Sequence, residues 1–322
     1  MQTTTQLPTI QLGETGLNIT RVGFGAWAIG GGGFEHSWGP QDDTESMAAI
    51  QRALEQGVNW IDTAAAYGFG HSEKVVGRAL DGLSNDERPY VFTKASLVPG
   101  PGGRVLNNLK RDSILREAGD SLERLGVDAI DLYQIHWPIP DEDIEEGWSA
   151  VLDLKEQGLV RHIGVSNFTV DQLERIGLIA PVETLQPPYS LVAREVEQDV
   201  LPYAERARIG VIVYSPMGSG LLTGAMTRER IERLPEDDWR KHDQRFHEPQ
   251  LSEHLAMVGR LQAVADRHGT TAGAVAVAWT LCNPAVDGAI VGFRRPGQVD
   301  PIITAAHLEL EDDDIATIEG RT

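Results

Sequence analysis

The sequence predicts an α/β protein folded as a (β/α)8 TIM barrel, and three observations support this fold class. Eight short apolar runs alternate with longer segments whose apolar residues recur every three or four positions, as in parallel βαβ units. The runs are mostly continuously apolar, which is expected of strands with both faces buried. The chain has 322 residues, and such barrels commonly use about 250 residues or more as one domain.

The eight predicted strands are rich in β-branched and aromatic residues. Eight units favour a closed barrel over an open doubly wound sheet. No linker or change in composition separates them, so we expect residues 1–322 to form a single barrel domain. The predicted strands are Val22–Trp27, Val58–Asp62, Tyr90–Lys94, Ala129–His136, Val160–Val165, Val182–Gln186, Val211–Tyr214 and Ala289–Gly292.

The segments between the strands show the three- and four-residue spacing of amphipathic helices, as Met47, Ile50 and Leu54 do. In four of the units, a glycine follows the helical pattern and stands shortly before the next strand. Glycine is favoured there because it adopts the left-handed φ that commonly ends a helix. The four predicted helix-ending glycines are Gly57, Gly126, Gly158 and Gly210.

Three segments fall outside this repeating pattern. The segment Thr9–Thr20 contains two short apolar stretches around Gly13 and Gly16, so we expect an N-terminal β-hairpin that caps the barrel floor. The segment Thr223–Pro249 is charged and too long for an ordinary connection, which indicates a functional insert or lid. The loop Leu97–Asn108, rich in proline and glycine, is a second candidate for a functional loop.

Composition excludes several classes of function. The chain has 28 Lys and Arg against 48 Asp and Glu, a formal net charge of −20, which excludes nucleic-acid and anionic-membrane partners. The single cysteine, Cys282, excludes an intrachain disulfide and fits a reducing compartment. Residues 1–12 lack the basic and apolar regions of a secretory signal, and the apolar stretch Ala272–Cys282 is too short to cross a membrane. We therefore expect a cytoplasmic protein.

In a barrel, catalytic residues gather at the carboxyl ends of the strands. The second predicted strand ends at Asp62, with Tyr67 in the following loop, and the third ends at Lys94. The lysine ammonium should lower the tyrosine pKa from about 10, while the aspartate holds the lysine in place. His136, at the end of the fourth strand, can donate a hydrogen bond to a carbonyl oxygen. The four residues could thus protonate that oxygen as hydride reaches its carbon.

Around these residues the sequence resembles the aldo-keto reductase superfamily, and within it the bacterial NADPH-dependent enzymes. The resemblance extends in order from about Leu12 to Glu319 with the strand spacing intact. The strings that carry it are Asn59–Ala64 followed by Tyr67–Gly68, Ser72–Glu73 and Gly77, then Val91–Lys94, Asp131–Pro138, Ile163–Phe168, Gln186 and Tyr214–Pro216.

The resemblance implies a barrel reductase that uses a nicotinamide dinucleotide without a Rossmann domain. It implies that Tyr67 is the general acid, that Lys94 and Asp62 tune it, and that His136 orients the carbonyl of a small-molecule substrate. It also implies NADPH/NADP in preference to NADH. Family members are often monomers and some assemble, so a monomer is slightly favoured and the sequence leaves the oligomeric state open.

The resemblance also assigns the cofactor contacts. Ser166, Asn167 and Gln186 match the positions that hold the nicotinamide carboxamide, and Tyr214 matches the ring that stacks on the nicotinamide. The loop after Tyr214 offers backbone N–H groups to phosphates, and the adjacent arginines after the eighth strand can grip a phosphate. In the family the latter segment holds the adenosine 2′-phosphate. The phosphate-binding candidates are Ser215, Pro216, Gly218, Gly220, Leu221, Gly292, Arg294, Arg295 and Gln298.

Aromatic residues near the barrel mouth are candidates for the substrate pocket. Trp27 and Trp137 match family positions near the substrate. Phe34 and Trp38 lie in a glycine-rich first loop, where lining the pocket and sealing the rim are equally good interpretations. No metal site is expected, because the histidines lack the spacing of metal ligands.

Two alternative functions stay open. Lys94 could be the nucleophile of a Schiff-base aldolase, with Asp62 and Tyr67 assisting. That chemistry has no need for the predicted carboxamide-binding residues or for the arginine pair. The second alternative is a non-catalytic subunit that senses the cofactor, because some family members bind cofactor and turn over slowly. The sequence identifies neither the physiological substrate nor the direction of the reaction.

Overall fold

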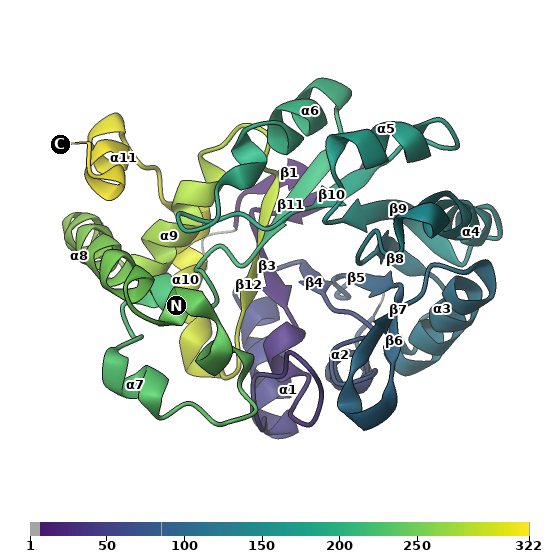
Figure 1. Ribbon diagram of the computed structural model, residues 1–322, viewed down its shortest axis with the longest axis horizontal. Coiled ribbons are helices and arrows are strands. Elements are labelled where there is room, and N and C mark those ends of the chain that lie inside the picture. Colours follow the sequence, from purple (N-terminus) through teal and green to yellow (C-terminus); the bar gives the residue numbers. More distant parts are fainter. Residues whose placement is uncertain (1–6, 85, 322) are drawn as a thin grey trace.

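The computed structural model describes residues 7–84 and 86–321, and at its centre lies a closed barrel of eight strands (Figure 1). Each strand pairs in parallel with the next barrel strand along the chain, and the last pairs with the first. Helices surround the barrel (Figure 1), as expected when each strand returns through a crossover. The predicted TIM barrel is confirmed. The predicted absence of a secretory signal concerns residues 1–12, of which residues 1–6 lie outside the described residues.

Every predicted strand overlaps a strand of the barrel, although the bounds differ by one or two residues. The first strand ends at Gly25, so Trp27, expected within it, instead begins the 3-10 helix Trp27–Ile29. His136, expected within the fourth strand, follows it directly. The barrel strands are β3 (Val22–Gly25), β4 (Trp60–Asp62), β5 (Tyr90–Ala95), β8 (Ile130–Ile135), β9 (Val160–Ser166), β10 (Thr184–Gln186), β11 (Gly210–Tyr214) and β12 (Gly288–Gly292).

The described residues contain eleven α-helices, which form the outer layer and parts of the loops. They are α1 (Asp43–Glu55), α2 (His71–Ala79), α3 (Arg111–Leu125), α4 (Ile144–Glu156), α5 (Val170–Gly177), α6 (Val200–Ala207), α7 (Arg228–Glu232), α8 (Gln250–His268), α9 (Ala272–Leu281), α10 (Val299–Ile303) and α11 (Asp312–Glu319).

Three of the four glycines predicted to end helices have left-handed backbones. The φ angles are 92° at Gly57, 64° at Gly126 and 77° at Gly158. The prediction is wrong for Gly210, which begins β11, because Arg208, with a φ of 57°, caps the end of α6. A Cβ at position 210 would lie 2.8 Å from the backbone nitrogen of Gly13. Glycine is needed there for close approach of two backbones and not for a helix end.

The N-terminal hairpin closes the floor of the barrel, as predicted. Its strands β1 (Thr9–Gln11) and β2 (Asn18–Thr20) pair antiparallel. The Gly13 backbone N–H donates to Oδ2 of Asp287 at 3.1 Å, which ties the hairpin to the start of β12. The apolar side chains of the hairpin and of the barrel interior form one cluster, made of Leu12, Leu17, Ile19, Trp60, Phe92, Leu132, Ile212 and Ile290.

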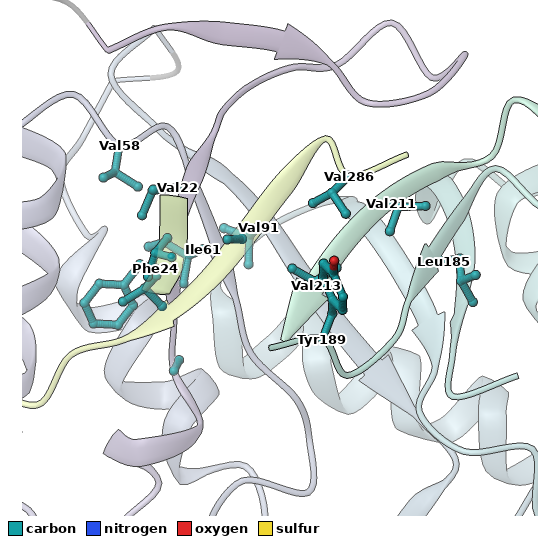
Figure 2. Close-up of a cluster of buried hydrophobic side chains, with 14 of the residues drawn as sticks. Val22, Phe24, Val58, Ile61, Val91, Leu185, Tyr189, Val211, Val213 and Val286 are labelled. Carbon is teal, nitrogen blue, oxygen red and sulfur yellow. The ribbon is translucent and has the colours of Figure 1, made fainter. Parts of the chain in front are cut away.

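The alternation of side chains along each strand separates the outer core from the barrel interior. Val91 of β5 belongs to the cluster between barrel and helices shown in Figure 2, whereas Phe92 belongs to the interior cluster. Two residues beyond Phe92, Lys94 continues the inward row towards the carboxyl end. In β4, Asp62 continues the row of Trp60 in the same way. The alternation of side chains along the strands therefore places the polar side chains of Asp62 and Lys94 inside the barrel at its mouth.

Two elaborated loops stand at the carboxyl ends of the strands. The segment 97–108 contains an unpredicted hairpin of β6 (Leu97–Pro99) and β7 (Val105–Asn107). The segment 223–249 contains α7 and two 3-10 helices, Trp239–His242 and Gln244–Phe246. Its apolar residues Met226, Ile231, Leu234 and Phe246 form a small core with the flanking Leu221 and Leu251. Among the described helices, none is long and apolar enough to cross a membrane.

Candidate active site

A buried ion pair between Lys94 and Asp62 lies at the centre of the site. Lys94 Nζ donates to Asp62 Oδ1 at 2.5 Å, to the carbonyl oxygen of Thr63 at 2.9 Å and to Tyr67 Oη at 3.4 Å. Burial lowers the pKa of Lys94, and the Asp62 carboxylate opposes that shift. Because an ammonium has three N–H donors, the three acceptors hold the group in one orientation.

Tyr67 lies in the turn between β4 and α2, and its ring is edge-on to that of His136 at a centroid distance of 5.6 Å. Burial, followed by the Asp62 carboxylate, raises the pKa of Tyr67 well above its usual value of 10.0. This corrects the expectation that Lys94 lowers that pKa. The cost of burying a charged phenolate outweighs its attraction to the Lys94 ammonium. Lys94 Nζ also lies closer to Asp62, at 2.5 Å, than to Tyr67, at 3.4 Å. Tyr67 therefore keeps its proton at neutral pH and can only donate it.

His136 follows β8 and is 9% exposed. Burial, assisted by the Lys94 charge, lowers the pKa of His136 well below its usual 6.5, so the imidazole is neutral at pH 7. Its backbone is held from two sides. The His136 N–H donates to the carbonyl oxygen of Ala95 at 3.0 Å, and its carbonyl oxygen accepts from Asn167 Nδ2 at 2.9 Å.

Gln134 completes the surroundings of Asp62, and sequence reasoning gave it no role. Asp62 Oδ2 accepts from Gln186 Nε2 at 2.8 Å and from Gln134 Nε2 at 3.4 Å. Gln186 Nε2 also lies 3.2 Å from Gln134 Oε1. The available signal was position, because Gln134 stands two residues before His136 and so faces the same way.

The four residues predicted to hold and stack on the nicotinamide form one hydrogen-bonded group. Ser166 Oγ donates to the carbonyl oxygen of Gln186 at 2.8 Å, and Asn167 Nδ2 donates to Ser166 Oγ at 3.0 Å. Tyr214 Oη donates to Asn167 Oδ1 at 2.8 Å. Burial raises the pKa of Tyr214 to about 12. Asn167 has a φ of 65° and does not cap α5, which begins after the capping residue Thr169.

The loop after β11 makes consecutive tight turns. Ser215, Gly218 and Gly220 have φ angles of 56°, 56° and 94°. The N–H groups of Gly218, Gly220 and Leu221 donate to carbonyl oxygens within the loop. Pro216, also predicted to contact the cofactor, lines the cavity together with Ser215 and Gly220. The N–H groups of Gly218, Gly220 and Leu221, expected to be open to a phosphate, are therefore occupied within the loop.

The segment after β12 is a compact turn around Gln298. Gln298 Oε1 accepts from the backbone N–H groups of Arg294 at 2.8 Å and of Arg295 at 3.2 Å. Arg295 and Gly292 are exposed and line the cavity. The side-chain amide oxygen of Gln298 thus shapes the turn that presents Arg295.

Arg294 is tied to the loop after β3. Its Nε donates to Gln41 Oε1 at 2.6 Å, and its Nη atoms donate to the carbonyl oxygens of Trp38 at 3.1 Å and Pro40 at 2.6 Å. These contacts engage all three guanidinium nitrogens of Arg294 within the protein itself. The two arginines therefore differ in environment, although they could not be distinguished from the sequence.

One cavity of about 1820 Å³ opens at the carboxyl ends of the strands. This exceeds the roughly 300–1,000 Å³ of a pocket for one drug-sized ligand. Every residue predicted for the site lines this cavity except Lys94, Gly218 and Leu221, which are buried. The tertiary structure thus brings together residues from the ends of all eight strands, from Trp27 after β3 to Gln298 after β12.

Tryptophans from separate loops line one side of the cavity. Trp27 stacks on Trp239 of the insert at a centroid distance of 5.5 Å and lies 6.2 Å from the Tyr67 ring. Trp38 meets Trp27 and Trp239 edge-on at 5.2 and 5.8 Å. Trp137 is 39% exposed and lines the same cavity. Trp239 was missed by sequence reasoning, since its only signal was an aromatic residue in a charged insert.

The residues present fit a nicotinamide dinucleotide. The amide and hydroxyl groups at the ends of β9 to β11 can hold a carboxamide, and the exposed guanidinium of Arg295 after β12 can bind a phosphate. The cavity is large enough for the dinucleotide and a small substrate together. No cluster of three or more His, Cys, Asp or Glu suited to a metal ion occurs within residues 7–84 and 86–321.

Comparisons with known proteins agree with this geometry. The model of a family described as "Aldo/keto reductase family" matches residues 21–321. Aldo-keto reductase YhdN of Bacillus subtilis is 41% identical over 315 residues, which cover 97% of this chain and 93% of that protein. An NADH-specific methylglyoxal reductase of Escherichia coli is 33% identical over 318 residues, covering 95% of each chain. The structure of a glycerol dehydrogenase from Gluconobacter oxydans matches with a TM-score of 0.87 at 38% identity, covering 97% of this chain and 94% of that one.

Proposed function

The chain belongs to the aldo/keto reductase family, and we propose that it reduces an aldehyde or ketone to an alcohol with NADPH. One observation carries the proposal. The protonated hydroxyl of Tyr67 lies against the buried Lys94–Asp62 pair and beside the neutral ring of His136, in one cavity with a group of amide and hydroxyl side chains. That arrangement provides a proton donor, a charge to stabilise the resulting phenolate and a hydrogen-bond donor for the carbonyl.

Each of the four residues has a distinct task in the reduction. His136 donates a hydrogen bond that orients the carbonyl oxygen of the substrate. When bound, the reduced nicotinamide supplies a hydride to the carbonyl carbon. Tyr67 Oη gives its proton to the carbonyl oxygen, so the C=O double bond becomes an alcohol. Lys94 stabilises the phenolate left on Tyr67 until water reprotonates it, and Asp62 keeps Lys94 oriented.

Exposed Arg295, beside Arg294, supports NADPH over NADH as the cofactor. A guanidinium at the end of the eighth strand can bind a 2′-phosphate, which NADH lacks. Since the E. coli relative is NADH-specific by name, both cofactors belong in the assay. We expect kcat/KM to be higher with NADPH.

The environment of Lys94 disfavours the aldolase alternative. Lys94 is 1% exposed and its N–H donors are committed to Asp62, Thr63 and Tyr67, so its nitrogen does not face the cavity as a nucleophile. Borohydride trapping of a substrate on Lys94 would favour the aldolase. Cofactor binding without turnover would favour the non-catalytic subunit.

A substrate panel tests the proposal. The purified chain is assayed with NADPH and NADH against 4-nitrobenzaldehyde, methylglyoxal, sugars, quinones and steroid-like ketones, and with NADP⁺ and NAD⁺ against glycerol. Methylglyoxal and glycerol are included because relatives are named for them. We expect oxidation of NADPH with at least one carbonyl. Absence of turnover across the panel would refute the proposed function.

We further propose that residues 1–322 form one domain located in the cytoplasm. Candidate site residues extend from Trp27 to Gln298, so no division of the chain would leave the site whole. The single cysteine, Cys282, supports a reducing compartment. The net charge of −20 supports a small-molecule substrate over a nucleic-acid or membrane partner.

A further inference from the structure

A second hydrogen-bonded group lies beside the site and is centred on Ser96, directly after β5. The Ser96 N–H donates to Glu117 Oε2 on α3 at 3.0 Å, and the Ser96 carbonyl oxygen accepts from the N–H of Asn108 at 2.9 Å. Its hydroxyl lies 3.3 Å from both the backbone nitrogen and the carbonyl oxygen of Trp137. Ser96 therefore links α3, the β6–β7 hairpin and the segment after β8.

The backbone at Ser96 is strained. Its φ is 84°, a left-handed value that residues with a Cβ rarely adopt and that persists only where the surroundings enforce it. Ser96 is fully buried, and Glu117 is 6% exposed. Ser113 Oγ donates to the second oxygen of Glu117 at 2.9 Å, so both carboxylate oxygens have partners. A buried carboxylate thus enforces the conformation of Ser96.

Charged and titratable groups from three elements surround Glu117. Arg116 and Arg124 of α3 oppose the effect of burial, which raises the pKa of Glu117 to about 7. Burial, followed by the charges of Glu117 and of Glu73 on α2, raises the pKa of Tyr133 on β8. Tyr133 and Glu73 therefore belong to the same buried layer as Glu117. The carboxylate therefore changes its charge close to neutral pH.

The segments joined by Ser96 form a wall of the cavity. Trp137 directly follows His136 and lines the cavity. Leu97 and Val105 of the β6–β7 hairpin line it too. The hydrogen bond between Ser96 and Asn108 closes the base of that hairpin. Ser96 and Glu117 themselves lie behind this wall.

We propose that Glu117 and Ser96 are positioning residues for the carbonyl substrate, the buried carboxylate holding Ser96, and Ser96 holding Trp137 and the β6–β7 hairpin in place. The proposal rests on the proposed reductase function. Because neither residue reaches the reacting atoms, their loss raises the KM for the carbonyl and leaves kcat and cofactor affinity close to those of the wild type.

Steady-state kinetics with 4-nitrobenzaldehyde and NADPH test the proposal on the full chain. Ser96→Ala removes only the hydroxyl that contacts Trp137, and Glu117→Ala removes the acceptor for the Ser96 N–H. We expect each to raise the KM for the aldehyde about tenfold while kcat changes less than about threefold. Glu117→Gln keeps an acceptor and should give a smaller increase.

Tyr133→Phe is the matched control. It deletes a hydroxyl from the same buried layer, and that hydroxyl has no hydrogen-bond partner among the described residues. Its kinetic constants should equal those of the wild type. The KM of the wild type should also rise as the pH falls through about 7, because protonation weakens the hydrogen bond from Ser96. The KM of Glu117→Gln should not change over that range.

Hydrogen–deuterium exchange covers the case in which Glu117→Ala does not fold. Peptides spanning residues 96–108 and 136–140 should exchange faster in Ser96→Ala than in Tyr133→Phe. An unchanged KM and unchanged exchange in Ser96→Ala, or an equal loss of kcat and NADPH affinity, would overturn the proposal. Failure of the positioning proposal can be distinguished from failure of the proposed reductase function. If the reductase function is wrong, the wild type itself is inactive, and that result overturns both proposals.

Discussion

At the scale of single residues, burial sets the protonation states of the site more than neighbouring charges do. The pKa of Tyr67 is raised and that of His136 is lowered, and desolvation is the largest cause in both cases. Burial thus favours the neutral form of each side chain. A neutral phenol and a neutral imidazole suit a site that donates one proton and one hydrogen bond.

Tyr67→Phe tests the general acid directly. The variant keeps the ring that packs beside Trp27 and His136 and loses only the hydroxyl. We expect kcat for carbonyl reduction to fall by at least about a hundredfold, the size expected for a general acid. Affinity for NADPH, measured by fluorescence titration, should stay unchanged. A near-normal kcat would refute the assigned role.

Sequence reasoning found the ionisable residues of the site because strand ends in a barrel converge. Asp62 and Lys94 lie at or one residue before such ends and form an ion pair, and His136 directly follows one and packs against Tyr67. It did not find Gln134, since an amide within a strand looks like any polar residue. It also gave the wrong direction for the Tyr67 pKa, because desolvation depends on packing that no local pattern reports.

At the scale of elements, the N-terminal hairpin depends on a close approach between two backbones. A Cβ on Gly13 would lie 2.4 Å from the backbone nitrogen of Gly210, and the φ of Gly13 is 50°. The turn and the start of β11 therefore both require glycine. The sequence indicated the hairpin from its turn residues, but it could not show what the hairpin touches.

Gly13→Ala should therefore destabilise the fold more than a matched change in the same turn. We expect Gly13→Ala to lower the free energy of unfolding by about 3 kcal/mol, combining overpacking with left-handed strain. Gly16→Ala, at a φ of 81° with no described atom within 4 Å of its Cβ, should cost about 1 kcal/mol. Urea denaturation of both variants measures the difference, and equal losses would contradict the packing argument.

The turn after β12 joins two loops that the sequence treated separately. Arg294 ties the loop at Trp38, Pro40 and Gln41 to the segment predicted to bind phosphate. Arg294 thus links the loop of the predicted pocket residue Trp38 to the segment predicted to bind phosphate. The exposed Arg295 remains the better candidate for a 2′-phosphate, since the guanidinium of Arg294 already donates hydrogen bonds within the protein.

Arg295→Ala should raise the KM for NADPH about tenfold and leave the KM for NADH unchanged, because only NADPH has the phosphate. Arg294→Ala should instead raise the KM for the carbonyl as well, by releasing the loop that holds Trp38. Parallel assays with both cofactors separate these effects. Equal changes in the KM for NADPH and for NADH in Arg295→Ala would show that this arginine does not bind the 2′-phosphate.

At the scale of the whole molecule, buried charge links stability to pH. Burial raises the pKa of Glu117 from 4.5 to about 7, so the folded chain binds more protons than the unfolded chain between these values. Stability from this group is therefore fully present below about pH 4.5 and is lost as the pH rises through about 7.

Glu117→Gln should remove this component. Between pH 4.5 and 8, the free energy of unfolding of the variant relative to the wild type should rise by about 3 kcal/mol. Guanidinium denaturation at a series of pH values, with Tyr133→Phe as a control from the same buried layer, measures the shift. A difference between variant and wild type that does not vary with pH would contradict it.

The sequence by itself determined the barrel, the hairpin on its floor and most of the residues that meet at its mouth. It could do so because strand period and strand-end position are local properties that hold in any parallel barrel. Only the tertiary structure decided the protonation states of Tyr67 and His136, the separate environments of Arg294 and Arg295, and the link from Glu117 to Trp137. Those depend on burial and on contacts between segments far apart in the chain, which no local pattern encodes.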